Sequence, residues 1–170
     1  VAEEYLVFWR DVDYFMWVFY AKLTVDIGDS AQWQFGFCFS RDISNLNALR
    51  DPRDGTVITS SGALHVPLVD DFVRKEGRFQ WACFHDTDVN VNGTVGWVIL
   101  DYFPPTAELN LEFGGVNEYQ INTFAENPPK GGKIKYRAGM HVYLACLVYP
   151  YVDDSDEWWR PTDDLAARLY

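Results

Sequence analysis

The feature that most constrains the fold is a strict alternation of bulky and small side chains. In Trp33–Phe39 the odd positions carry aromatic rings and the even positions carry small or polar residues. Neighbouring side chains of a strand point to opposite faces of a sheet, so this period of two predicts a strand. From Trp17 to Ile27 every odd position is apolar. With the polar turn Gly28–Ser30 between them, the two segments are expected to form a β-hairpin.

Further strands are expected elsewhere in the chain, at Tyr5–Asp13, Thr56–Ser60, Phe79–His85, Val95–Phe103, Glu108–Phe113, Tyr119–Phe124 and Met140–Pro150. Residues 41–55 are the one place for a short helix, with Asp42 or Ser44 as its N-cap. Long and uneven connections between about eight strands favour a jelly roll. The sequence therefore predicts an all-β fold, an eight-stranded antiparallel jelly-roll sandwich with one short helix in a connecting loop.

Length and charge limit the organisation and the partners of the chain. Its 170 residues suffice for one core. We therefore expect a single domain at 1–152, and a C-terminal extension at 153–170 that packs on a neighbouring surface. The net charge of −11 repels phosphate backbones, so little or no direct nucleic-acid contact is expected. No apolar run approaches the roughly 20 residues that span a bilayer, which predicts no membrane partner.

The cysteines indicate a reducing compartment. Cys38, Cys83 and Cys146 are odd in number, and each lies in a predicted strand. Disulfide scaffolds usually have an even number of cysteines, so three buried thiols are expected. Because the sequence starts at Val1 and not at methionine, we expect a processed product, a fragment or a trimmed chain.

Cys83 and His85 are the best candidates for metal ligands. They stand two apart on one predicted strand and so share a face, as two zinc ligands could. Further ligands would have to come from Cys38, Cys146, His65 or His141. None of these forms a paired motif, so we interpret Cys83 as a buried thiol and His85 as a strand-end histidine. No metal and no cofactor are expected.

Glu108 and Glu112 are the best pair of carboxylates for catalysis. Four residues apart on a strand, they lie about 13 Å apart along its axis. This exceeds the roughly 5–9.5 Å of glycoside hydrolysis. Glu118, Glu126 or Asp101 could approach from another strand. A solvated strand face is the simpler interpretation, and the sequence predicts no catalytic residue and no enzyme.

The seven tryptophans differ in their expected roles. Four of them, Trp17, Trp33, Trp81 and Trp97, fall on the core positions of predicted strands. Adjacent Trp158 and Trp159, followed by Arg160, instead have the composition of a protein–protein anchor. We therefore predict a subunit interface at Trp158, Trp159, Arg160 and Tyr170.

The order of the segments resembles the coat-protein jelly roll of picorna-like viruses. Trp17–Arg41 is similar to the C–D hairpin of that family, and the apolar Gly62–Leu68 to the segment before its F strand. Gly96–Pro105, with the sequence GWVILDYFPP, is similar to the G strand and its exit. Met140–Val152 would be the final I strand. The chain looks most like a small capsid subunit of a plant secovirid, of the cheravirus or comovirus kind.

The resemblance implies a function in assembly. Such a subunit is cut from a polyprotein in the host cytoplasm and packs beside sister jelly-roll subunits into an icosahedral virion that protects an RNA genome. It has no catalytic site, and its partners are other capsid subunits. Many such coat proteins carry basic arms, which this chain lacks, so its acidic surface suits the outside of a particle.

A carbohydrate-binding β-sandwich, either a lectin or a glycosidase-associated module, is the alternative. Flat aromatic rings suit the apolar face of a pyranose. This function requires exposed aromatic residues in one groove or on one face, from the loops around Asn90–Gly93 and Gly114–Glu118.

Overall fold

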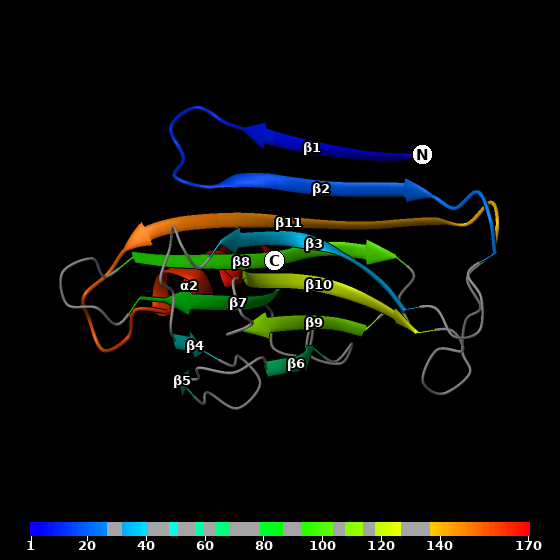
Figure 1. Cartoon of the computed structure of the whole chain (residues 1–170). Coiled ribbons are helices and arrows are strands. Elements are labelled where there is room, and N and C mark those ends of the chain that lie inside the picture. Colours follow the sequence, from blue (N-terminus) through cyan, green and yellow to red (C-terminus); the bar gives the residue numbers. More distant parts are fainter. Residues whose placement is uncertain are drawn as a thin grey trace.

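The computed structural model of the chain describes residues 1–26, 32–40, 48–50, 57–59, 64–68, 79–86, 93–103, 108–113, 118–126 and 137–170. Side chains are described at 1–26, 79, 81–86, 93–101 and 137–170. These parts of the chain form antiparallel strands and one helix, α2 (Arg160–Leu169), which follows the last strand (Figure 1). The prediction of a mostly β, antiparallel fold is confirmed.

The larger sheet has seven strands. Its order across the sheet is β1 (Ala2–Phe8), β2 (Phe15–Lys22), β11 (His141–Val152), β8 (Gly93–Phe103), β7 (Gln80–His85), β4 (Ala48–Arg50) and β5 (Val57–Thr59). All neighbours run antiparallel. Strands β7, β8 and β11 confirm three of the predicted strands, because the alternation of buried side chains is strong there.

The smaller sheet has four antiparallel strands. Its order is β3 (Gln32–Ser40), β10 (Glu118–Glu126), β9 (Glu108–Phe113) and β6 (Leu64–Leu68). It lies in front of the larger sheet in Figure 1, and α2 lies behind that sheet. The larger sheet is therefore the middle layer, with a different cover on each face.

The predicted hairpin of Trp17–Ile27 and Trp33–Arg41 is wrong. Strand β2 pairs with β1 on one side and with β11 on the other, so both of its edges are occupied. Strand β3 belongs to the smaller sheet and pairs with β10. Alternation identified both strands correctly, but it carries no information about the partner of a strand.

Of the segment 41–55, in which the sequence predicts a short helix, residues Ala48–Arg50 form the short strand β4. The rest of that segment lies outside the described residues, so a helix there stays a prediction. The described helix is α2, within the segment 153–170 that was expected to be an extension. It starts with Pro161 in its first turn, has Asp163 near its N-terminus and Arg168 in its last turn. These residues favour a helix at those positions because they match the helix dipole and the missing first N–H groups.

The helix-facing side of the larger sheet is apolar. Trp81, Val98 and Leu147 come from three neighbouring strands and pack against Leu165 and Ala166 of α2. Both helix residues are at most 2% exposed. Burial of these side chains, rather than the helix propensity of ten residues, accounts for the stability of α2.

The opposite side of the same strands is equally apolar. Its side chains alternate along the strands with those beneath the helix, and the largest that are fully buried are Trp17, Phe84, Trp97, Ile99 and Leu144. They belong to the face on which the smaller sheet lies. A strand covered on both faces contains a nearly continuous apolar run, as Val95–Leu100 does.

A glycine in β8 sets how closely the helix approaches. A Cβ atom at Gly96 would lie 1.9 Å from Oγ1 and 2.8 Å from Cγ2 of Thr162, which is fully buried in α2. No side chain fits between the strand and the helix at this point. The position therefore requires glycine because of the close contact.

We expect Gly96→Ala to lower the free energy of unfolding by about 1–3 kcal/mol, because the added methyl group overpacks this contact. Urea denaturation measures the loss. Thr162→Ala removes the two closest atoms, so its cost should be smaller in the Gly96→Ala variant than in the wild type. Simply additive losses would contradict the steric explanation.

Candidate interaction surface

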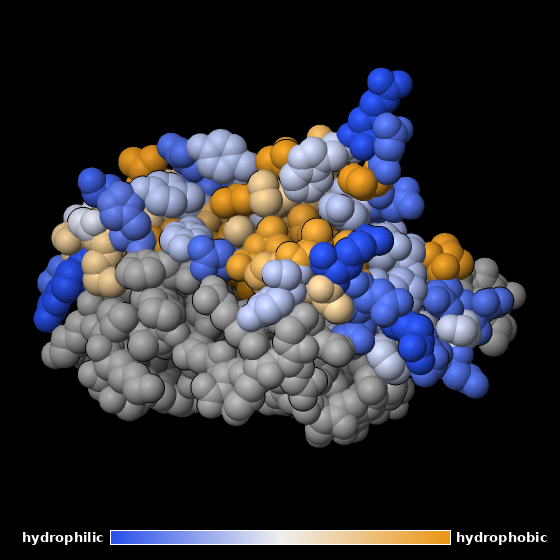
Figure 2. Space-filling view, turned by 180° about the vertical axis from the view of Figure 1, so that it is seen from behind, coloured by the Kyte–Doolittle hydropathy of each residue, from blue (hydrophilic) through white to orange (hydrophobic). Residues whose placement is uncertain are grey.

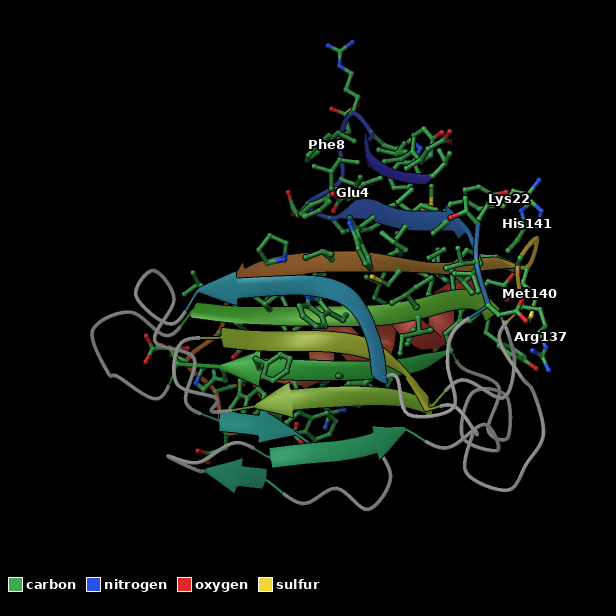
Figure 3. The ribbon with its side chains drawn as sticks, turned by 45° about the vertical axis from the view of Figure 1, so that its right-hand side comes forward. Glu4, Phe8, Lys22, Arg137, Met140 and His141 are labelled. Carbon is green, nitrogen blue, oxygen red and sulfur yellow. The ribbon has the colours of Figure 1, made fainter. Side chains whose placement is uncertain are left out.

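Strand β1 is the edge of the larger sheet, and its side chains are exposed on both faces. Within the described strands its one neighbour is β2. Tyr5, Leu6 and Phe8 are 50%, 51% and 69% exposed. Figure 3 shows Glu4 and Phe8 on this outer strand, away from the covered part of the sheet. Large apolar side chains at an open sheet edge are typical of a surface that binds another protein.

An apolar groove of about 640 Å³ lies on the helix side of the sheet, next to this edge. It is lined by Trp9, Val12, Tyr14, Met16, Phe79, Leu100, Leu147 and Leu169. Figure 2 shows this face, with hydrophobic residues gathered in its middle. Among the described residues that line it, Tyr14 carries the one ionisable side chain. Such a groove can bind apolar side chains of a partner.

The wall of the groove is held by ring contacts. Tyr14 meets Trp9 edge-on, with ring centroids 6.1 Å apart, and it meets Tyr149 of β11 in the same way at 6.2 Å. Edge-to-face pairs of this kind stabilise a fixed ring position. The groove is therefore formed in the isolated chain, before any partner binds.

The C-terminal segment packs on the chain's own sheet. Trp158 is 7% exposed and stacks on His85, with ring centroids 4.7 Å apart. Trp159 stacks on Trp81 at 6.2 Å, and the Arg160 guanidinium lies 5.8 Å from the centroid of the Trp159 ring. Trp158 has little surface left for a second subunit. The surface on which the 153–170 extension packs thus includes the 1–152 domain itself.

The other residues of the predicted interface keep exposed surface. The Arg160 side chain is 55% exposed, and its Nε donates a hydrogen bond of 2.8 Å to Glu157. Tyr170 is 57% exposed and meets Phe79 edge-on at 5.7 Å. Through Phe79 and Leu169, the end of the helix borders the apolar groove. Tyr170 is therefore close to the groove, and the subunit interface at Trp158, Trp159, Arg160 and Tyr170 stays a prediction.

A polar network joins the helix to the sheet beneath Trp158. The Tyr151 hydroxyl donates to the carbonyl oxygen of Trp158 at 2.8 Å and lies 2.9 Å from the Thr162 hydroxyl. The Cys83 thiol lies 3.3 Å from the same tyrosine oxygen. On the helix, Asp163 accepts a hydrogen bond of 2.8 Å from Trp81 Nε1. The sequence analysis did not foresee this network, because its members are far apart in the sequence.

Cys83 and His85 do lie on one face, as predicted, but each has a structural partner. Burial raises the pKa of the Cys83 thiol to about 12, so the thiol stays protonated at neutral pH. His85 Nδ1 lies 2.8 Å from the hydroxyl of Thr94. Cys146 is a second buried free thiol, on the other face of the sheet. Among the described residues there is no group of three or more metal-ligating side chains.

The remaining candidate residues are placed as follows. Glu108 and Glu112 lie on β9, four residues apart, but their side chains are outside the described part, as are those of Cys38 and His65. His141 contacts the Tyr20 hydroxyl at the exposed start of β11. Most residues of the loops at Asn90–Gly93 and Gly114–Glu118 lie outside the described ranges. The described residues therefore test neither the carboxylate pair nor the carbohydrate-binding alternative.

Basic side chains gather where β11 begins. Lys22 and His141 are direct partners in the register of β2 and β11, and Figure 3 shows them with Arg137 and Met140 at one end of the sheet. Arg137 donates a hydrogen bond of 2.7 Å to Asp26. The hydrogen bond from the backbone of Ala138, followed by that from Arg137, lowers the pKa of Asp26. These contacts fix the turn before β11.

Comparison with protein-family models, with curated proteins and with solved structures found no match for this chain. No helix in the described ranges has the length and the apolar character needed to cross a membrane. The functional conclusion therefore depends on the geometry of the surface itself.

We expect the free energy of unfolding to fall as the pH drops from about 7 to about 5, in part because of His85. Burial lowers the pKa of this histidine in the folded chain, although the charges of Asp86 and Asp153 oppose the shift. The unfolded chain takes up the proton near pH 6.5, roughly the usual histidine value. The stabilisation is complete above that pH and is lost as the pH falls through the folded pKa.

Urea denaturation across this pH range tests the expectation, with His85→Gln as the matched variant. The variant should lose less stability between the two pH values than the wild type. Equal losses would show that His85 makes no contribution to the pH dependence.

Proposed function

We propose that this chain is a structural capsid subunit, which assembles with sister jelly-roll subunits into an icosahedral shell around an RNA genome. One observation carries the proposal, namely the concentration of exposed apolar side chains at one edge. Of the ten large hydrophobic residues exposed in the described part of the chain, six lie within residues 1–12. They are Val1, Tyr5, Leu6, Phe8, Trp9 and Val12. A surface of this kind favours a protein that functions by association.

The pairing of the strands supports a jelly roll. Eight of the strands pair as one nested hairpin: β2 with β11, β3 with β10, β6 with β9, and β7 with β8. Among these eight strands, the first therefore pairs with the last and the second pairs with the second-last, as in one long hairpin. Strands β1, β4 and β5 would be additions to this roll. The distribution of the pairs over the two sheets differs from the usual jelly roll, in which the first and third pairs share a sheet, because here the fourth pair, β7–β8, shares a sheet with β2 and β11.

The charge of the chain fits a position on the outside of a shell. A net charge of −11 opposes contact with phosphate groups, so other subunits would have to hold the genome. The same charge makes copies of the chain repel one another at low salt. Assembly through apolar contacts should therefore strengthen as salt screens the repulsion.

The carbohydrate-binding alternative finds less support. The groove has aromatic walls at Trp9 and Tyr14, but the rest of its lining consists of Phe79 and of aliphatic or thioether side chains. Sugars require several hydrogen-bond donors and acceptors in addition to an aromatic platform. An apolar groove favours apolar side chains of another protein instead.

We expect the full chain to form oligomers whose mass rises with protein and salt concentration, and Val12→Lys to weaken them at least tenfold. Val12 lines the groove and is 38% exposed, so a charge there disrupts a contact without entering the core. Val25→Lys is the matched control, because Val25 is 67% exposed and lies outside the groove. Light scattering after size-exclusion chromatography and negative-stain microscopy give the readout.

A wild-type chain that stays monomeric at every concentration and salt would contradict the proposal. Equal weakening by the two lysine substitutions would remove the groove from the assembly surface. Saturable quenching of tryptophan fluorescence by a glycan, together with a monomeric chain, would favour the carbohydrate-binding module.

A further inference from the structure

The hydrogen bonds at the start of β1 define which backbone groups face outward. Val1 and Lys22 exchange two backbone hydrogen bonds, with Lys22 N donating to Val1 O at 2.9 Å and Val1 N donating to Lys22 O at 3.3 Å. In an antiparallel pair, hydrogen-bonded positions alternate with non-hydrogen-bonded ones. The residues of β1 whose N–H and C=O groups point to β2 are therefore Glu3, Tyr5 and Val7. Those whose groups point away from β2 are Ala2, Glu4, Leu6 and Phe8.

The outward groups form a row that another strand can pair with. No described strand occupies this side of β1. The side chains do not cover it either, since Tyr5 and Leu6 are each about half exposed, at 50% and 51%. An open strand edge of this length is usually protected in a monomer by a bulge, a proline or charged side chains, lysine above all. The sequence Ala2–Phe8 has no proline or lysine and pairs with β2 without a register shift, and its charged residues are Glu3 and Glu4.

The sequence of β1 is complementary to itself in one antiparallel register. If a twofold axis passes through Tyr5, Glu3 lies opposite Val7 of the second copy and Glu4 lies opposite Leu6. Ala2 then pairs with Phe8, so that all seven residues of the strand are used. In this register, the residues whose N–H and C=O groups point away from β2 lie opposite each other, as the alternation of hydrogen-bonded pairs requires.

The neighbouring registers are poorer. An axis through Glu4 places two like charges directly opposite each other, which destabilises a strand pair. An axis through Leu6 leaves Ala2 and Glu3 without partners in the strand and shortens the ladder. The register on Tyr5 instead places each carboxylate opposite an apolar residue, and the two Tyr5 rings next to each other.

We propose that β1 pairs with β1 of a second copy, antiparallel, about a twofold axis at Tyr5. The two seven-stranded sheets then form one continuous sheet. This inference rests on the proposed function, because it names the partner and the register of one assembly contact. It is independent of the groove, which lies on one face of the sheet, whereas the pairing uses the backbone edge.

Cysteine substitution along β1 tests the register. Tyr5 would be a non-hydrogen-bonded pair on the axis, with Cα atoms about 4.5 Å apart. This distance lies within the roughly 4.4–6.8 Å that a disulfide spans. We expect Tyr5→Cys to give a covalent dimer upon mild oxidation with diamide. Cys83 and Cys146 are buried, and the wild-type chain controls for all native thiols.

Glu3→Cys and Val7→Cys are matched controls on the same face of the strand. In the proposed register, neither should cross-link to itself, whereas an equal mixture of the two chains should cross-link. Cross-linking of Glu3→Cys alone, or its absence in the Tyr5→Cys chain, would overturn the register. If the wild type still oligomerises in that case, the capsid proposal stands and the β1 inference fails.

A proline substitution gives a second readout that needs no thiol. Leu6 directs its N–H outward, so Leu6→Pro removes a donor of the new ladder and none of the bonds to β2. We expect the dimer to dissociate at least tenfold more readily, while the near-ultraviolet circular dichroism of the monomer is kept. Unchanged dimerisation of the folded variant, with loss upon Val12→Lys, would assign the contact to the groove and refute the pairing.

Discussion

The larger sheet has bulky apolar side chains on both faces, and the rest of the structure follows from the need to cover them. One face lies toward the smaller sheet. The other is covered by α2, where Trp81 and Val98 pack against Leu165. Each buried side chain of this size contributes on the order of 1.5–3 kcal/mol relative to an exposed one, so neither cover can be removed cheaply. Gly96 is the point at which this packing leaves no spare volume.

The layers that cover the larger sheet do not extend to its β1 edge, and this explains where the interaction surface lies. Strand β2 is half-buried, whereas β1 is exposed along nearly its whole length. The apolar groove marks the boundary, between the turn at Val12 and the end of α2 at Leu169. Proteins that function as monomers seldom leave such a boundary apolar. Its presence connects the layered fold to the proposal of assembly.

Alternation predicted the strands because it is a local property of the backbone. It identified β7, β8 and β11 closely, and it failed for the hairpin of β2 and β3, since strand pairing depends on residues more than one hundred positions away. Helix α2 was not predicted, for another reason. The residues from Pro161 to Arg168 carry ordinary helix signals, but the acidic and aromatic residues before them suggested an extended tail.

The interface residues were only partly predictable for the same reason. Adjacent Trp158 and Trp159 indicated a contact, but the sequence could not show that Trp158 stacks on His85 of the same chain. The groove brings together residues from both ends of the chain, from Trp9 to Leu169, which no local pattern connects. The edge strand β1 was only partly within reach of sequence reasoning, since the strand predicted at Tyr5–Asp13 overlaps β1 at Tyr5–Phe8 but extends into the turn that follows it. Its position at the edge of the sheet was not.

The position of α2 at the C-terminal end has a consequence for biosynthesis. Strand β2 cannot pair with β11, and the back of the sheet cannot be covered by α2, until residues 141–169 have left the ribosome. Until then the emerging polypeptide presents Trp81 and Val98 to the cell, and the long loop closures make the final step slow. The apolar face that stabilises the finished sheet therefore favours aggregation for as long as it is uncovered.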